Sequence, residues 1–187
     1  MINNRIKQIV IIAGITLATC GGFTAYYYHK STQGPISDFN PLTDMQPVLA
    51  IFNKDFDWLT ANKDSSPAFM FRNRTYDNNP IHFGMLKIKV LREGDKIAGF
   101  TSYYMEQHQQ GRILFVAVGH EFRGKGYGKL LTQYAMNELF KMGADHLALW
   151  TRVDNFPAQK IYKGLGFVEV FDSGDGFVFF ECHPHNH

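Results

Sequence analysis

The chain has 187 residues, of which 45% are hydrophobic and 15% aromatic, enough for one globular domain whose core needs neither a metal nor disulfides. The formal net charge is +2 and the basic residues are scattered, which excludes the charged footprint of a nucleic-acid-binding protein. The two cysteines, Cys20 and Cys182, match neither a disulfide framework nor a metal-binding motif.

The first segment of the chain is apolar. Residues 9–28 carry no charged side chain and end in three tyrosines. About twenty helical residues, each rising ~1.5 Å, span the ~30 Å core of a bilayer, and aromatic side chains favour its interface. We therefore predict one N-terminal apolar helix in a transmembrane or signal-anchor segment, residues 1–29, with the membrane as its partner. A cleaved secretion signal, a lipoprotein signal at Cys20 and a buried helix are the alternatives.

A polar linker with glycine and proline breakers follows at residues 30–37. The folded domain is predicted at residues 38–182. Apolar residues at helical spacing predict a first helix within 45–59. Polar residues and turn signals predict a long loop at 62–84. Alternating apolar and lysine residues predict a hairpin within 85–107.

The second half of the domain alternates between strands and helices. The apolar run at 111–118 predicts a strand at the centre of a sheet, buried on both faces. A helix is predicted from Tyr127 to a glycine cap at Gly143. A strand at 146–153, a short helix at 155–166 and a hairpin at 167–182 complete the domain. This order predicts an α/β fold with a mixed sheet.

Three glycines, Gly124, Gly126 and Gly128, stand between the apolar strand and the helix. Without side chains, they allow a bulky anion to approach the first helical turn, whose N–H groups lack internal partners and whose dipole end is positive. Arg123 and Lys125 add positive charge at the rim. The pattern therefore predicts a phosphate or pyrophosphate site. A tight turn without a ligand is the alternative, and neither the dinucleotide-binding nor the P-loop fingerprint fits.

The runs RGKGYG at 123–128 and NFPAQKIYKGLGF at 155–167 resemble the two signature motifs of the GNAT family of N-acetyltransferases. The resemblance covers about residues 38–182 and implies a mixed, mostly antiparallel central sheet flanked by helices. It implies acetyl-CoA as co-substrate, with the central strand pairing with the pantetheine arm and the glycine loop holding the pyrophosphate. The implied coenzyme contacts are Val116, Ala117, Val118, Arg123, Gly124, Lys125, Gly126, Tyr127, Gly128, Lys129 and Asn155.

The resemblance also implies that the acetyl group passes to a primary amine, without a metal. Tyr162 is implied as the general acid that assists the leaving thiolate, with aromatic packing as the alternative. His120 is the candidate general base because its unperturbed pKa lies near neutrality. A turn role for His120, with a water chain as base, is the alternative. A second function class is a binding module that keeps the coenzyme pocket without turnover.

Two positions argue against particular acceptors. Relatives that acetylate histones carry Glu where this chain has Arg112, and relatives that acetylate an N-terminal alanine carry Glu where it has Trp150. The resemblance therefore leaves the acceptor amine open.

The two ends of the chain bear on location. Residues 183–187 contain three histidines and are predicted to be a solvated tail rather than a metal site. Arg5 and Lys7 precede the apolar segment and Lys30 follows it, which slightly favours an exported domain. Acetyl-CoA is a cytosolic metabolite, however. We therefore predict a single-pass N-terminal membrane anchor with the catalytic domain in the cytosol.

Overall fold

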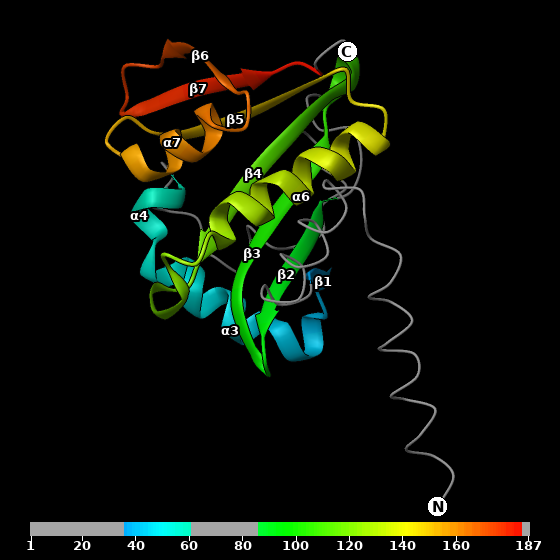
Figure 1. The fold of residues 1–187 in the computed structure, drawn as a ribbon, viewed down its shortest axis with the longest axis vertical. Coiled ribbons are helices and arrows are strands. Elements are labelled where there is room, and N and C mark those ends of the chain that lie inside the picture. Colours follow the sequence, from blue (N-terminus) through cyan, green and yellow to red (C-terminus); the bar gives the residue numbers. More distant parts are fainter. Residues whose placement is uncertain (1–35, 61–85, 185–187) are drawn as a thin grey trace, which may run out of the picture. The chain divides into compact units, whose positions relative to one another are not determined.

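The computed structural model describes residues 36–60 and 86–184, which belong to one folded unit. Its seven-stranded sheet has the order β1-β2-β3-β4-β5-β7-β6 (Figure 1). The strands are β1 (Ile36–Asp38), β2 (Lys87–Glu93), β3 (Lys96–Met105), β4 (Gln110–Val118), β5 (His146–Arg152), β6 (Val168–Asp172) and β7 (Phe177–Cys182). The helices are α3 (Pro41–Lys54), α4 (Phe56–Leu59), α6 (Tyr127–Lys141) and α7 (Phe156–Lys163), with 3₁₀ turns η1 (Gln107–Gln109) and η2 (His120–Phe122).

The sheet is mixed and mostly antiparallel, as the family resemblance implies. Among the pairs of neighbouring strands in the described residues, only β4 and β5 run parallel. A parallel pair needs a long crossover, which α6 supplies. Both predicted hairpins are present, as β2–β3 and β6–β7, and Gly94 adopts the positive φ of 60° in the first turn.

Strand β1 begins before the predicted start of the folded domain at residue 38. Ile36 and Ser37 fall in the predicted linker, yet they pair with Leu91 and Val90 of β2. The folded domain therefore begins by residue 36. An edge strand of three residues is too short to carry a visible alternation of apolar and polar side chains.

Helices cover both faces of the sheet. Helix α6 crosses β3 and β4 on one face, and α3 packs against the same strands on the other (Figure 1). Leu131, Ala135 and Leu139 of α6 are buried at helical spacing. Val48 and Phe52 of α3 are buried in a second cluster. These two layers fix the position of β4, the strand on which the site is built.

The predicted helix at 45–59 is divided into α3 and α4. Helix α3 begins earlier than predicted, where the side chain of Asn40 accepts a hydrogen bond from the Leu42 N–H at 3.0 Å. Asp55 separates the two helices, with a non-helical φ of −114° and ψ of 18°. Its N–H still bonds the Phe52 carbonyl at 3.1 Å, while its carboxylate binds residues much later in the chain. This tertiary contact has no local sequence signal.

The prediction that the central strand is buried on both faces is wrong. Buried and partly exposed residues alternate along β4. A bulge interrupts its pairing with β3, because Ile113 lies opposite Tyr103 and Phe115 opposite Ser102, which leaves Leu114 without a partner in β3. The strand reads as fully apolar because its partly exposed residues line clefts rather than meet bulk solvent.

Strands β4 and β5 pair only at one end. The register couples Gln110–Arg112 with His146–Ala148, and no further residue of β4 pairs with β5. Beyond Arg112 the two strands diverge, as Figure 1 shows. The edge of β4 up to Val118 therefore faces a gap instead of a neighbouring strand.

Within residues 36–60 and 86–184, no helix has the length and apolar character needed to cross a membrane. The predicted apolar helix at 9–28, the predicted loop at 62–84 and residues 185–187 of the tail lie outside the described residues. They stay predictions.

Candidate active site

A cleft of about 520 Å³ opens where β4 and β5 diverge. We call it the glycine-loop cleft, because the end of β4, the loop at 119–126 and the start of α7 line it. It brings together Val116, Ala117, Val118, Arg123, Gly124, Gly126, Tyr127, Gly128, Asn155 and Tyr162. Three predicted site residues, Lys125, Lys129 and His120, are not among its lining residues.

The loop has the backbone geometry that the glycines predict. Gly124 and Gly126 both have a φ of 79°, in the left-handed region that side chains disfavour. Gly126 is the N-cap of α6 and contributes no side-chain cap. The first N–H groups of this 15-residue helix therefore face the cleft without a side-chain acceptor. Such a helix end suits an anion.

Gly128 has a different role. A Cβ added at this position would lie 3.2 Å from Cδ1 of Ile161, on α7. The glycine therefore allows α6 and α7 to approach closely beside the cleft. The conformation of Gly128 itself is helical and is not strained.

The two cations predicted at the rim are already paired. The Arg123 Nη2 donates to Asp55 and its Nε donates to the Val118 carbonyl at 3.1 Å. Lys125 Nζ binds both oxygens of Glu93, at 2.7 and 3.0 Å. An anion in this cleft would therefore be held mainly by backbone N–H groups, while the two side chains hold the loop in place.

Tyr127 also helps to hold the loop, through the same carboxylate that binds Lys125. Its ring is buried, and its hydroxyl donates to Glu93. This hydrogen bond to a carboxylate raises the pKa of Tyr127 to about 12. Tyr127 therefore fixes the start of α6, and its backbone, rather than its hydroxyl, is what it presents to the cleft.

Asn155 caps helix α7. Its Oδ1 accepts a hydrogen bond from the Ala158 N–H at 3.3 Å, and Pro157 occupies the first turn. The described residues offer no partner to its Nδ2, which is a donor in a residue that lines the cleft. One side chain thus serves both as a cap and as a candidate donor to a ligand.

Tyr162 combines packing with an accessible hydroxyl. Its ring packs at 6.0 Å from Phe167 and 6.2 Å from Phe180, between ring centroids. Among the described residues, none hydrogen-bonds its hydroxyl, and Tyr162 lines two adjoining clefts. Burial raises the pKa of Tyr162 to about 12, so the phenol is protonated at any physiological pH.

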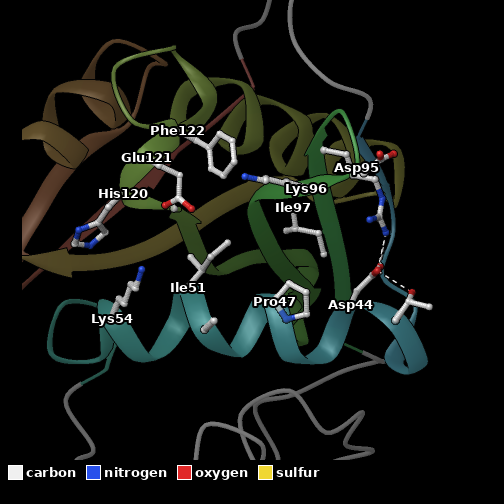
Figure 2. Close-up of a pocket in the computed structure, with 14 residues that line it drawn as sticks. Asp44, Pro47, Ile51, Lys54, Asp95, Lys96, Ile97, His120, Glu121 and Phe122 are labelled. Carbon is white, nitrogen blue, oxygen red and sulfur yellow. Dashed lines mark hydrogen bonds and ion pairs between the residues drawn. The ribbon is translucent and has the colours of Figure 1, made fainter.

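His120 lies in a different cleft, of about 460 Å³, between α3, the β2–β3 hairpin and η2. Figure 2 shows His120 and Glu121 on one wall of this cleft and Lys54 of α3 on the other. His120 Nε2 lies 3.0 Å from Asp55 Oδ1. The structure therefore does not bring the predicted base and Tyr162 into one cleft. The His120 side chain meets Asp55, and its backbone carbonyl accepts a hydrogen bond from the Arg123 N–H at 3.4 Å.

A third cleft, of about 330 Å³, adjoins the first. We call it the aromatic cleft, because Trp58, Trp150 and Phe177 line it. Six residues line both this cleft and the glycine-loop cleft: Trp58, Leu59, Val116, Asn155, Ala158 and Tyr162. A molecule held in each cleft would therefore meet its neighbour beside Tyr162.

Sequence reasoning missed the two carboxylates that hold the loop. Asp55 and Glu93 lie 68 and 32 residues before Arg123 and Lys125, the residues that they bind. No motif marks them, since separations of this size are closed only by the tertiary fold. Among the described residues, no group of three or more His, Cys, Asp or Glu side chains is placed to hold a metal.

Comparison with known proteins finds a matching family model and relatives that are named acetyltransferases. A family model described as Acetyltransferase (GNAT) family matches residues 45–167. Over 82 residues the chain is 35% identical to a mycothiol acetyltransferase of Corynebacterium urealyticum. The aligned region covers 40% of this chain and 24% of that protein. It is 32% identical over 82 residues to N-alpha-acetyltransferase 30 of Schizosaccharomyces pombe, covering 42% of this chain and 55% of that one.

A solved structure shares the fold. The crystal structure of Ard1 from Thermoplasma volcanium superposes with a TM-score of 0.63 at 20% identity, over 80% of this chain and 97% of that one. Among the curated relatives, the chain spans about a quarter of the mycothiol acetyltransferase and about half of N-alpha-acetyltransferase 30.

Proposed function

Because the chain belongs to the GNAT family of acetyltransferases, we propose that it transfers the acetyl group of acetyl-CoA to the nitrogen of a primary amine. Both relatives compared above are named acetyltransferases, which supports the reaction type. The acceptor, the membrane tether and the residue roles below are proposals for this chain.

The observation that carries the proposal is the divergence of β4 and β5. Since β4 has no strand partner on this side beyond Arg112, its edge at Val116–Val118 is open to an extended ligand. The same cleft continues to the N-terminus of α6, which suits a pyrophosphate. An extended arm ending in a pyrophosphate is the shape of coenzyme A, and the open strand edge suits the amides of its arm.

The reaction needs four balanced changes. The C–N bond forms as the amine nitrogen attacks the thioester carbonyl, the C–S bond breaks, the nitrogen loses a proton and the sulfur gains one. The products are an N-acetyl amine and coenzyme A as its thiol. Tyr162 lies where the two clefts meet, so its hydroxyl is placed to donate a hydrogen bond to the leaving sulfur.

The raised pKa of Tyr162 makes its hydroxyl a hydrogen-bond donor to the sulfur rather than a proton donor. A thiol has a pKa of about 8.5, so complete proton transfer from a phenol of pKa about 12 to the thiolate is unfavourable. Tyr162 therefore stabilises the charge that develops on sulfur through a hydrogen bond. The thiolate then takes its proton from solvent.

The proton acceptor for the amine is water in this proposal. The described residues that line the aromatic cleft include no His and no Glu. Asp175 is its one described carboxylate, and its pKa is held below the usual range by a hydrogen bond from Ser173, which makes it a poor base. His120 is separated from Tyr162 by the arrangement of the clefts.

The test is a two-part assay on the full-length protein. Acetyl-CoA is supplied with a panel of primary amines, free thiol is titrated and the acetylated amine is identified by mass spectrometry. We expect both products in equal amounts, with no thiol release when the amine is omitted. Tight coenzyme binding in calorimetry, with no acetylated product, would overturn the enzyme in favour of the binding module.

We also propose that residues 9–28 tether the protein to a membrane with its catalytic domain on the cytosolic side. The uninterrupted apolar composition supports the tether, and the supply of acetyl-CoA supports the orientation. Protease added to intact spheroplasts should leave the domain undigested until the membrane is permeabilised. Digestion of the domain from outside would show that it faces away from the cytosol. Recovery of the protein in the soluble fraction without detergent would contradict the membrane tether.

A further inference from the structure

The aromatic cleft points to the chemical class of the acceptor. We propose that this enzyme prefers primary amines that carry an aromatic ring near the amino group and no carboxylate, with Trp150 as the residue that selects them. The inference rests on the proposed function, because it assigns the aromatic cleft to the acceptor. The shared residues Val116, Asn155 and Tyr162 place an amine from this cleft beside the leaving sulfur.

Trp150 is held rigidly with part of its ring uncovered. It lies edge-on to Phe171, at 5.4 Å between ring centroids, and is tilted against Phe179 at 4.7 Å. Register explains the contact, since Trp150 and Phe171 both pair with Phe179 on β7. Trp150 is nevertheless 40% exposed and lines the cleft. A fixed, exposed ring offers flat apolar area at little cost in side-chain entropy.

The other walls of the cleft extend the aromatic surface. Trp58 of α4 is 46% exposed and also lines the cleft, and Phe177 lies on β7. A ring entering between these side chains would gain edge and face contacts with each of them. A short aliphatic amine would leave most of this surface in contact with water.

The cations near the cleft do not favour an acidic acceptor. Arg112 binds Glu106 through Nε at 3.0 Å and Nη2 at 2.9 Å, and its guanidinium stacks on Phe179. Its Nη1 has no hydrogen-bond partner, yet it is buried and so is not exposed to a ligand in the cleft. Arg152 donates twice to the Asp57 carbonyl and stacks on Phe177. The Arg112 guanidinium is therefore closed to a carboxylate, and Arg152 is not among the residues that line the cleft.

The carboxylate that lines this cleft is Asp175, whose pKa is lowered chiefly by the Ser173 hydroxyl, with help from the nearby cation of Arg152. Asp175 accepts hydrogen bonds from the Ser173 hydroxyl and from the Phe177 N–H, at 3.3 Å for the latter. These contacts keep it ionised, and it is exposed at the turn between β6 and β7. An ionised carboxylate attracts an ammonium and repels a carboxylate, although salt screens the effect at an exposed site.

The experiment compares matched amines with the full-length enzyme. Propylamine has a methyl group where 2-phenylethylamine has its ring, and phenylalanine is 2-phenylethylamine with an added carboxylate. We expect kcat/KM for 2-phenylethylamine to exceed that of each of the others about tenfold or more. Peptides that begin with Phe or Ala test whether a peptide amine gains from the same ring.

Two variants assign the preference to Trp150. W150A should raise KM for 2-phenylethylamine about tenfold and leave kcat at saturation, KM for propylamine and the Kd of coenzyme A unchanged, while W150F should restore most of the preference. F156A is the control, because Phe156 is 70% exposed and lines none of the three clefts. Equal kcat/KM for 2-phenylethylamine and propylamine, or a preference that survives W150A, would overturn the inference. Coenzyme binding without acetylation of any amine would instead overturn the proposed function, and the inference with it.

Discussion

At the scale of single residues, Tyr162 shows how one side chain serves both packing and chemistry. Its ring belongs to the core beside Phe167 and Phe180, while its hydroxyl has no partner among the described residues and lines both clefts of the site. The two functions are therefore separable, since a phenylalanine keeps the ring and removes the hydroxyl.

Y162F is expected to lower kcat on the order of 100-fold, the lower end of the range for removing one hydrogen-bond donor that stabilises developing charge, because the donor to the leaving sulfur is lost. The Kd of coenzyme A should change little. Steady-state kinetics with calorimetry measures both. Y134F is the matched control, because Tyr134 lies on α6 outside the three clefts. Wild-type turnover in Y162F would remove Tyr162 from the mechanism.

Asn155 allows its capping role and its ligand role to be separated. N155D keeps an oxygen that caps α7 but loses the Nδ2 donor, whereas N155A loses both. N155A is expected to lower the free energy of unfolding by about 1 kcal/mol, and N155D to leave it nearly unchanged. Both should raise KM for acetyl-CoA. A normal KM in N155D would restrict Asn155 to its capping role.

At the scale of elements, the site depends on where α6 begins. Gly124 and Gly126 have positive φ, so a substitution there would strain the loop and confuse folding with binding. Gly128 lies in the first turn with helical geometry, and its nearest neighbour is the flexible end of Ile161. It is therefore the better position for testing the anion site.

G128D and G128A place the same Cβ beside Ile161 and differ by the carboxylate group. An acidic residue favours a helix N-terminus, so G128D should fold at least as stably as G128A. If the N-terminus of α6 binds the pyrophosphate, the carboxylate opposes it, and the affinity for coenzyme A should fall on the order of 100-fold relative to G128A. Calorimetry compares the two variants, and equal affinities would place the pyrophosphate elsewhere.

At the scale of the whole molecule, buried phenols couple stability to pH. The pKa of Tyr162 is raised from 10.0 to about 12 by burial, and that of Tyr127 to about 12, chiefly by its hydrogen bond to Glu93. Burial also raises the pKa of Tyr103. Below pH 10 the folded and unfolded chains both keep these protons. Above it the unfolded chain loses them first, which favours unfolding.

The free energy of unfolding should therefore fall as the pH rises from about 10 to about 12, with Tyr162 contributing on the order of 2 kcal/mol. Urea unfolding of the wild type and Y162F at pH 9 and pH 11.5 measures this contribution. The variant should lose less stability than the wild type over this interval. Parallel losses in the two proteins would show that Tyr162 has no such effect.

The sequence by itself determined the features whose signals are local. Both hairpins, the helix after the glycine loop and the short helix near 155–166 follow from alternation, helical spacing and turn residues within a few neighbouring positions. The resemblance of the glycine loop and of the run at 155–167 to the GNAT motifs implied one site that includes Val116–Val118, Asn155 and Tyr162, and these residues line one cleft. Short-range backbone preferences depend on residues that are neighbours in the chain, so they can be recognised from the sequence without the tertiary structure.

Only the tertiary structure decided which charges are free. Arg123 and Lys125 read as open cations, but Asp55 and Glu93 bind them across 68 and 32 residues. His120 lies two residues after Val118, yet η2 turns it into a different cleft, where it meets Asp55. The partner of a charged side chain is set by which distant segments pack together. No local pattern encodes that choice, because the free energy of packing belongs to the whole sheet and its helices.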